Sequence, residues 1–158
     1  MRSILTKRIE LNTTTRTVLF GIVSGMIWSA LAENLISGDE FKSYESAIAV
    51  GAGVLTGILV SFMLKSRLAK CGRMATFGFG LLSLPTGAFF FGVLNSLGQF
   101  IATRITGIEY PSFSSDPIEN GITLALLSVI SLLAVILFPL AVFTTFLLRT
   151  ITCSAKKS

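Results

Sequence analysis

Four long apolar runs dominate this chain, over residues 17–36, 46–64, 74–103 and 117–148. The third run holds thirty residues without a charge, and about 20 apolar residues in a helix already cross the roughly 30 Å hydrocarbon core of a bilayer. Because a bilayer satisfies no backbone polar group, runs of this length are expected to form helices. The composition agrees, with 52% hydrophobic and 13% charged residues. We therefore predict an all-α integral membrane protein.

The runs predict a four-helix bundle made of two helical hairpins, with helices near residues 17–36, 46–64, 75–102 and 117–148. Residues 1–16 are then an N-terminal segment, residues 17–148 the transmembrane domain, and residues 149–158 a tail. The fourth helix has a start signal, because Asp116 can cap a helix that has Pro117 at its first position and Glu119 at its third. Pro139 lies inside this run, where it predicts a kink.

The distribution of basic residues predicts the orientation. Eleven of the thirteen Lys and Arg residues lie at the two chain ends or in the loop between the second and third runs. Lys and Arg beside spanning segments stay mainly on the cytoplasmic side. The residues of that loop that set the topology are Lys65, Arg67, Lys70 and Arg73. We expect both termini in the cytoplasm, and a bacterial inner (plasma) membrane rather than a eukaryotic one.

The beginning of the chain has a second interpretation. A basic start, an apolar stretch and Ala30-Leu31-Ala32 resemble a secretory signal with its cleavage site. Cleavage there would remove residues 1–32 and leave three helices with the same orientations.

Small residues recur along the predicted helices, where they permit close helix packing in lipid. The positions that we predict to pack are Gly21, Gly25, Ser29, Gly53, Gly57, Ser61, Ala88 and Gly92. Their spacing by four in the first two helices predicts that these helices contact each other along glycine-lined faces.

Polar residues near the outer ends of the first and third helices form the candidate site. We hypothesise an outward-opening polar pocket made by Glu33, Asn34, Asn95, Gln99 and Arg104. An ionisable residue at membrane depth is costly and marks a candidate functional position. The competing interpretation is that Glu33 is solvated at the headgroup level.

The chain lacks histidine and has two cysteines. This excludes a His-ligated haem, a His/Cys zinc site and a Ser-His-Asp triad. We therefore predict neither an enzyme nor a cofactor or metal site. Cys71 and Cys153 are both expected on the cytoplasmic side, where thiols stay reduced. The basic residues flank apolar runs, so they indicate lipid headgroups rather than nucleic acid as their partner.

Two classes of function fit these observations. The first is a small non-catalytic membrane protein that packs against other membrane proteins, as an accessory or assembly subunit or an immunity or exclusion protein. The second is a small oligomeric transporter or channel that uses the pocket around Glu33. Its partners would be the bilayer, other membrane proteins, or further copies of itself.

Overall fold

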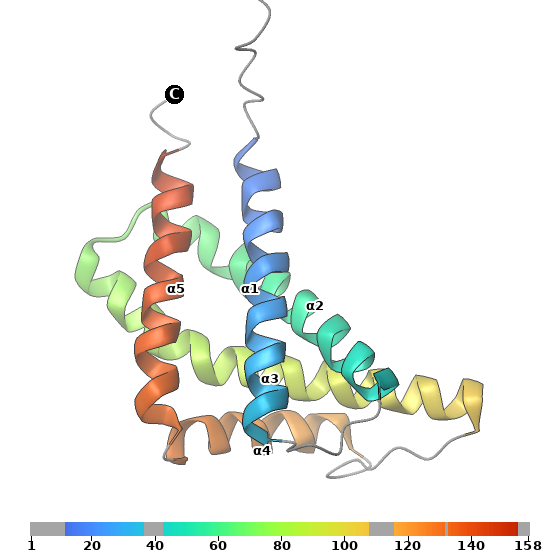
Figure 1. The fold of residues 1–158 in the computed structure, drawn as a ribbon. Helices are drawn as coiled ribbons and strands as arrows, with labels where there is room; N and C mark the ends of the chain where they lie inside the picture. The colour runs from blue at the N-terminus through green and yellow to red at the C-terminus, as the bar shows by residue number, and fades with distance from the viewer. Residues whose placement is uncertain (1–11, 37–42, 108–115, 132, 155–158) are drawn as a thin grey trace, which may run out of the picture.

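The computed structural model describes residues 12–36, 43–107, 116–131 and 133–154 (Figure 1). These residues form α-helices and no β-strand, which confirms the predicted all-helical class. The helices are α1 (Thr13–Ile36), α2 (Ser43–Leu68), α3 (Arg73–Thr106), α4 (Pro117–Ile130) and α5 (Ala134–Ser154). Four of them, α1, α2, α3 and α5, are long and apolar enough to cross a membrane. The chain thus has the architecture of a multi-pass membrane protein.

The spanning helices extend beyond the apolar runs that predict them. α2 continues through the basic residues to Leu68, with Lys65 and Arg67 in its last turn. Lys and Arg are good helix formers, and a positive charge is favourable near a helix C-terminus. The helical backbone therefore continues past the edge of the apolar run, and the charged side chains lie at the helix end.

The helices do not form a regular parallel bundle. In Figure 1, α1 and α5 stand side by side, α2 and α3 run obliquely behind them, and α4 lies across one end. α3 has 34 residues, a length of roughly 51 Å at about 1.5 Å per residue. A helix longer than the hydrocarbon core can fit a bilayer by tilting. In Figure 1, α3 runs obliquely to α1 and α5.

The predicted fourth helix is two helices in the structure. α4 ends at Ile130 and α5 begins at Ala134, whereas α5 runs unbroken through Pro139. The backbone of Ser131 is extended, with φ −71° and ψ 151°. Its carbonyl accepts a hydrogen bond from the Ala134 N–H at 2.9 Å, and its own N–H donates to the Leu127 carbonyl at 3.0 Å.

The packing of α4 and α5 on α3 explains this turn. α4 contacts α3 where Gly121 meets Gly92, and α5 contacts α3 where Val142 meets Gly80. The two contacts lie 12 residues apart on α3, roughly 18 Å, but 21 residues apart on the other segment, roughly 32 Å if it were one helix. A straight helix from 117 to 148 cannot make both contacts, so the chain turns between them.

Side chains are sorted by size between the interior and the surface. The buried residues include small and hydroxyl-bearing ones: Thr17, Ser29, Thr56, Ser61, Thr76, Ala141 and Thr145. Large apolar residues project outward: Val23, Ile27, Leu55, Met63, Leu82, Ile101, Ile136 and Phe143. In lipid, large apolar side chains need no burial, whereas small residues permit close helix contacts. The described helices therefore present an apolar outer surface and contact one another through small residues.

Candidate functional site

The glycines of α1 and α2 face one another within the chain. A Cβ atom added to Gly21 would lie 2.7 Å from the Ile58 Cα, and one added to Gly57 would lie 2.9 Å from the Gly25 Cα. Carbon atoms in contact are normally about 3.5–4.0 Å apart. Only glycine permits this approach, so the two backbones are in direct contact. Ser29 and Ser61, which are also among the predicted packing positions, are both buried.

α3 makes equally close contacts with α4 and α5. A Cβ atom on Gly92 would lie 2.8 Å from the Gly121 Cα, and one on Gly80 would lie 2.7 Å from the Val142 Cα. Beside the first contact, Asn120 Nδ2 donates a hydrogen bond to Ser96 Oγ at 2.7 Å. These contacts attach α4 and α5 to α3 at two separate points.

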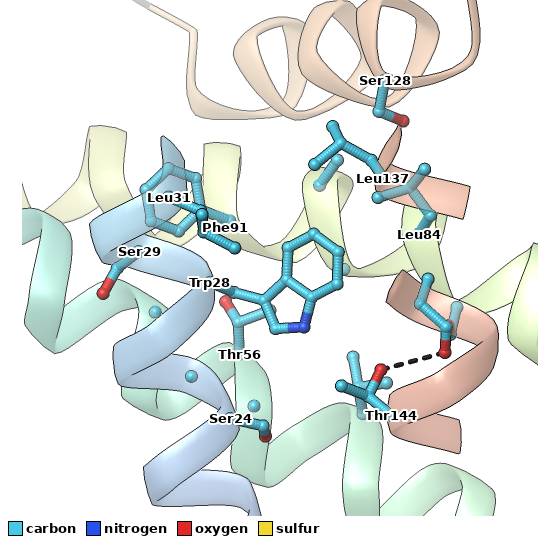
Figure 2. Close-up of a pocket in the computed structure, with 18 of the residues that line it drawn as sticks. Ser24, Trp28, Ser29, Leu31, Thr56, Leu84, Phe91, Ser128, Leu137 and Thr144 are labelled. Carbon is cyan, nitrogen blue, oxygen red and sulfur yellow. Dashed lines mark hydrogen bonds between the residues drawn. The ribbon is translucent and has the colours of Figure 1, made fainter. Parts of the chain in front are cut away.

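A cavity of about 360 Å³ lies between these two packed groups (Figure 2). All five helices contribute to its lining, and Ala88 is among the lining residues. It is partly open, since α1 and α5 contact each other far less than α1 contacts α2. Its described polar lining side chains are neutral: Ser24, Trp28, Ser29, Thr56, Ser61, Ser83, Ser128, Ser131, Thr144 and Thr145. The cavity is therefore suited to an uncharged, largely apolar group.

Several hydroxyls in the lining are hydrogen-bonded to their own helices. Ser128 Oγ donates to the Ala125 carbonyl at 2.7 Å, and Thr145 Oγ1 donates to the Ala141 carbonyl at 2.8 Å. Ser83 Oγ donates to the Gly80 carbonyl at 2.7 Å and lies 3.4 Å from Thr145 Oγ1. Hydroxyls that return to the helix backbone in this way are satisfied without a ligand.

Thr56 is different. Its residue is 8% exposed, and its Oγ1 is buried without a hydrogen-bond partner in the described structure. A buried hydroxyl that lacks a partner is unfavourable by about 1–3 kcal/mol. Thr56 belongs to the cavity lining, but its Oγ1 has almost no accessible surface, so the chain itself covers this atom.

Trp28 projects from α1 into the cavity (Figure 2). The described residues include no hydrogen-bond partner for its indole N–H. Tryptophan is normally enriched at membrane interfaces, whereas Trp28 lies in the interior of the helix Thr13–Ile36. The side chain thus places an available donor in an apolar part of the molecule.

The residues of the predicted outer pocket are only partly described. Asn95 and Gln99 are half-buried on α3, and Asn95 Oδ1 is buried without a hydrogen-bond partner in the described structure. Arg104 is exposed, with its guanidinium carbon 5.2 Å from the centre of the Phe100 ring. The side chains of Glu33 and Asn34 lie outside the described residues. The pocket around Glu33 therefore stays a prediction.

The four basic residues predicted to set the topology lie around the junction of α2 and α3. Lys65 Nζ donates a hydrogen bond to Thr14 Oγ1 at 3.0 Å, which connects the end of α2 to the start of α1. Arg67, Lys70 and Arg73 are exposed. The start of α1 and the end of α5 also lie together, because Arg16 and Thr150 line one surface groove. The same end of the molecule therefore carries the α2–α3 junction, the start of α1 and the end of α5.

The described residues contain no group of three or more His, Cys, Asp and Glu side chains that could hold a metal ion. Cys71 and Cys153 are free thiols. No part of the described structure therefore offers a metal centre or a disulfide.

Sequence reasoning did not identify Trp28 or Thr56. One signal was available for Trp28, since it is the single tryptophan of the chain and lies well inside an apolar run instead of at its edge. Nothing in the sequence distinguishes Thr56 from other threonines in spanning helices, because its lack of a partner depends on tertiary packing. Comparisons with protein-family models, with curated proteins and with solved structures find no match to this chain.

Proposed function

We propose that this chain is a small non-catalytic membrane protein that acts by packing against other membrane proteins, as an accessory or assembly subunit or an immunity or exclusion protein. The observation that carries this proposal is the outward face of α4. Ile118, Ile122, Leu126 and Ile130 recur at every fourth residue, and each is at least 50% exposed. They form one continuous apolar face along the helix.

The opposite face of α4 is occupied. Asn120 and Gly121 are buried against α3. α4 has 14 residues, or roughly 21 Å, which is too short to span a bilayer. A helix at the membrane interface normally turns its apolar face toward the acyl chains. α4 instead turns its small and polar residues toward α3, and its apolar face points away from the rest of the described chain. We propose that an apolar segment of another membrane protein covers this apolar face.

The same proposal includes an orientation. Six of the seven described Lys and Arg residues lie at or near the end where α1 starts and α2 and α5 finish, namely Arg16, Lys65, Arg67, Lys70, Arg73 and Arg149, and the exception is Arg104 in the last turn of α3. By the preference of Lys and Arg for the cytoplasmic side, this end and both termini face the cytoplasm. α4 then lies at the outer surface, and we propose the bacterial inner membrane as the location.

The test is native purification in polymer discs, with a photoreactive amino acid at residue 122 and mass spectrometry of whatever is crosslinked. The variant Ile122→Ser/Leu126→Ser is compared with Ile136→Ser/Phe143→Ser, which alters equally exposed positions on α5. We expect a stoichiometric foreign membrane protein with the wild type and the α5 variant, and its loss from the α4 variant. Absence of a foreign protein, or equal retention by the α4 variant, would overturn the proposal.

A small oligomeric transporter or channel is the second candidate function. It is favoured by the buried Asn95 Oδ1, which lacks a partner in the described structure and lies on the helix that carries the predicted pocket residue Gln99. We propose that this atom and Glu33 line a route for a solute. Purified protein in vesicles would then show ion or proton flux above that of empty vesicles, reduced by both Glu33→Gln and Asn95→Leu. Flux equal to that of empty vesicles argues against this candidate.

A further inference from the structure

The cavity between the helices has the dimensions of a ligand site. Its volume is about 360 Å³, within the roughly 300–1,000 Å³ range of small-molecule sites. Apolar cavities do not hold water well, because a buried water needs two to four polar partners. A space of this size inside a membrane protein is better filled by an apolar molecule from the bilayer.

One polar group in the lining defines what such a molecule must offer. The Trp28 indole N–H can only donate a hydrogen bond, and it has no partner among the described residues. Thr56 Oγ1 also lacks a partner, but the chain itself buries this atom, so a ligand in the cavity does not reach it. An acceptor oxygen on the ligand would satisfy the Trp28 N–H, whereas a charged group would meet no opposite charge in the described lining.

We propose that this cavity binds a neutral amphiphile, namely an apolar chain with a carbonyl or ester oxygen that accepts a hydrogen bond from Trp28. The chain occupies the space lined by Leu84, Phe91 and Leu137 (Figure 2). The ligand enters from the bilayer, since α1 and α5 make few direct contacts. Both an acyl ester of a membrane lipid and a free neutral ester provide this chemistry. This site goes beyond the proposed function and does not use the outward face of α4.

The chain carries its own reporter for this site, because Trp28 is its single tryptophan. Bromine atoms on an acyl chain quench tryptophan fluorescence on contact. We therefore propose titrating purified protein in polymer discs with two probes, methyl 9,10-dibromostearate and a phosphatidylcholine with dibrominated acyl chains. Unbrominated methyl oleate serves as the competitor that should restore the fluorescence.

Two glycines of α3 supply a matched pair of variants. A Cβ atom added at Gly87 or at Gly78 meets nothing within 4 Å, so both positions accept a side chain without a backbone clash. Gly87 lines the cavity and Gly78 does not. Gly87→Leu fills part of the cavity, whereas Gly78→Leu makes the same change on the same helix outside it. Thr56→Val keeps the side-chain shape and removes the hydroxyl.

We expect saturable, competable quenching in the wild type and in Gly78→Leu, and its loss in Gly87→Leu. Thr56→Val should bind the probe with the affinity of the wild type, because the hydroxyl that it removes is buried by the chain itself. Saturation by the phosphatidylcholine alone identifies a membrane lipid as the source, and saturation by the methyl ester alone identifies a free amphiphile. Quenching that rises linearly, or that is equal in all four proteins, would overturn the site.

Circular dichroism checks that each variant is folded. If Gly87→Leu fails to fold, the wild type and Gly78→Leu decide, and quenching that methyl oleate does not reverse then counts against the proposal. The result is separable from the partner experiment, because Ile122→Ser/Leu126→Ser should retain saturable quenching whether or not a partner protein is found.

Discussion

The backbone of Gly53 on α2 lies so close to Ser29 on α1 that a Cβ atom added to Gly53 would be 2.6 Å from the Ser29 Cβ. The Gly25 carbonyl oxygen would be only 2.7 Å away on the same side. Even the smallest substitution at Gly53 must therefore separate the two helices.

Gly53→Ala should destabilise the protein by about 1–3 kcal/mol, the usual effect of overpacking. Gly51→Ala is the control, because a Cβ at Gly51 on the same helix meets nothing within 4 Å, and alanine is the better helix former. Thermal unfolding in detergent, followed by circular dichroism, measures both. Equal transition temperatures for the two variants would contradict direct contact of the α1 and α2 backbones.

The hydrogen bond between Asn120 and Ser96 should stabilise the attachment of α4 to α3. Polar interactions between membrane helices contribute on average about 0.6 kcal/mol, and up to about 1.7 kcal/mol. A double-mutant cycle with Asn120→Ala and Ser96→Ala isolates this pair from the other interactions of Asn120. We expect a coupling energy within that range. Strict additivity of the two substitutions would show that the bond contributes nothing.

Asp116 should stabilise the first turn of α4. Its Oδ1 accepts a hydrogen bond from the Ile118 N–H at 2.8 Å, so Asp116→Ala should cost about 0.5–2 kcal/mol of local stability. Asp116→Asn retains an acceptor and should differ little from the wild type. Hydrogen exchange at the amides of residues 118–120 is the measurement, and faster exchange in both variants alike would rule out the cap.

The proposed orientation predicts the reactivity of thiols in intact cells. An impermeant thiol reagent added outside should not label Cys71, which lies at the junction of α2 and α3. In a background with Cys71→Ser and Cys153→Ser, the reagent should label Glu119→Cys near the start of α4. Labelling of Cys71 from outside, with protection of Glu119→Cys, would mean that the chain has the opposite orientation.

Features that depend on one segment could be predicted from the sequence. The apolar runs predicted helices at all four regions, and the Asp116-Pro117 pair predicted the start of α4, because caps depend on neighbouring residues. Helix ends were less accurate, since Lys65 and Arg67 extend a helix beyond its apolar run. The small residues spaced by four around Gly25 and Gly53 predicted that the first two helices contact each other, and in the structure their backbones are in direct contact.

Features that depend on several helices could not be predicted. The turn after Ile130 was not predicted, because it follows from the separate contacts at Gly80 and Gly92. The cavity is likewise invisible in the sequence, since its lining comes from five helices and its volume depends on how far α5 stands from α1. The position of Trp28 in the cavity and the burial of Thr56 Oγ1 both depend on that arrangement.

The close contact of α1 with α2 has a consequence for biosynthesis. The glycines of this contact lie between residues 21 and 57, so both helices have been synthesised before α3 begins at Arg73. Protein segments fold as units during synthesis, N-terminal ones first, which allows this hairpin to close early. The cavity is complete only when α5, which follows the other four described helices in the chain, reaches its place. A ribosome stalled before Ala134 would therefore leave a closed hairpin beside an unfinished cavity.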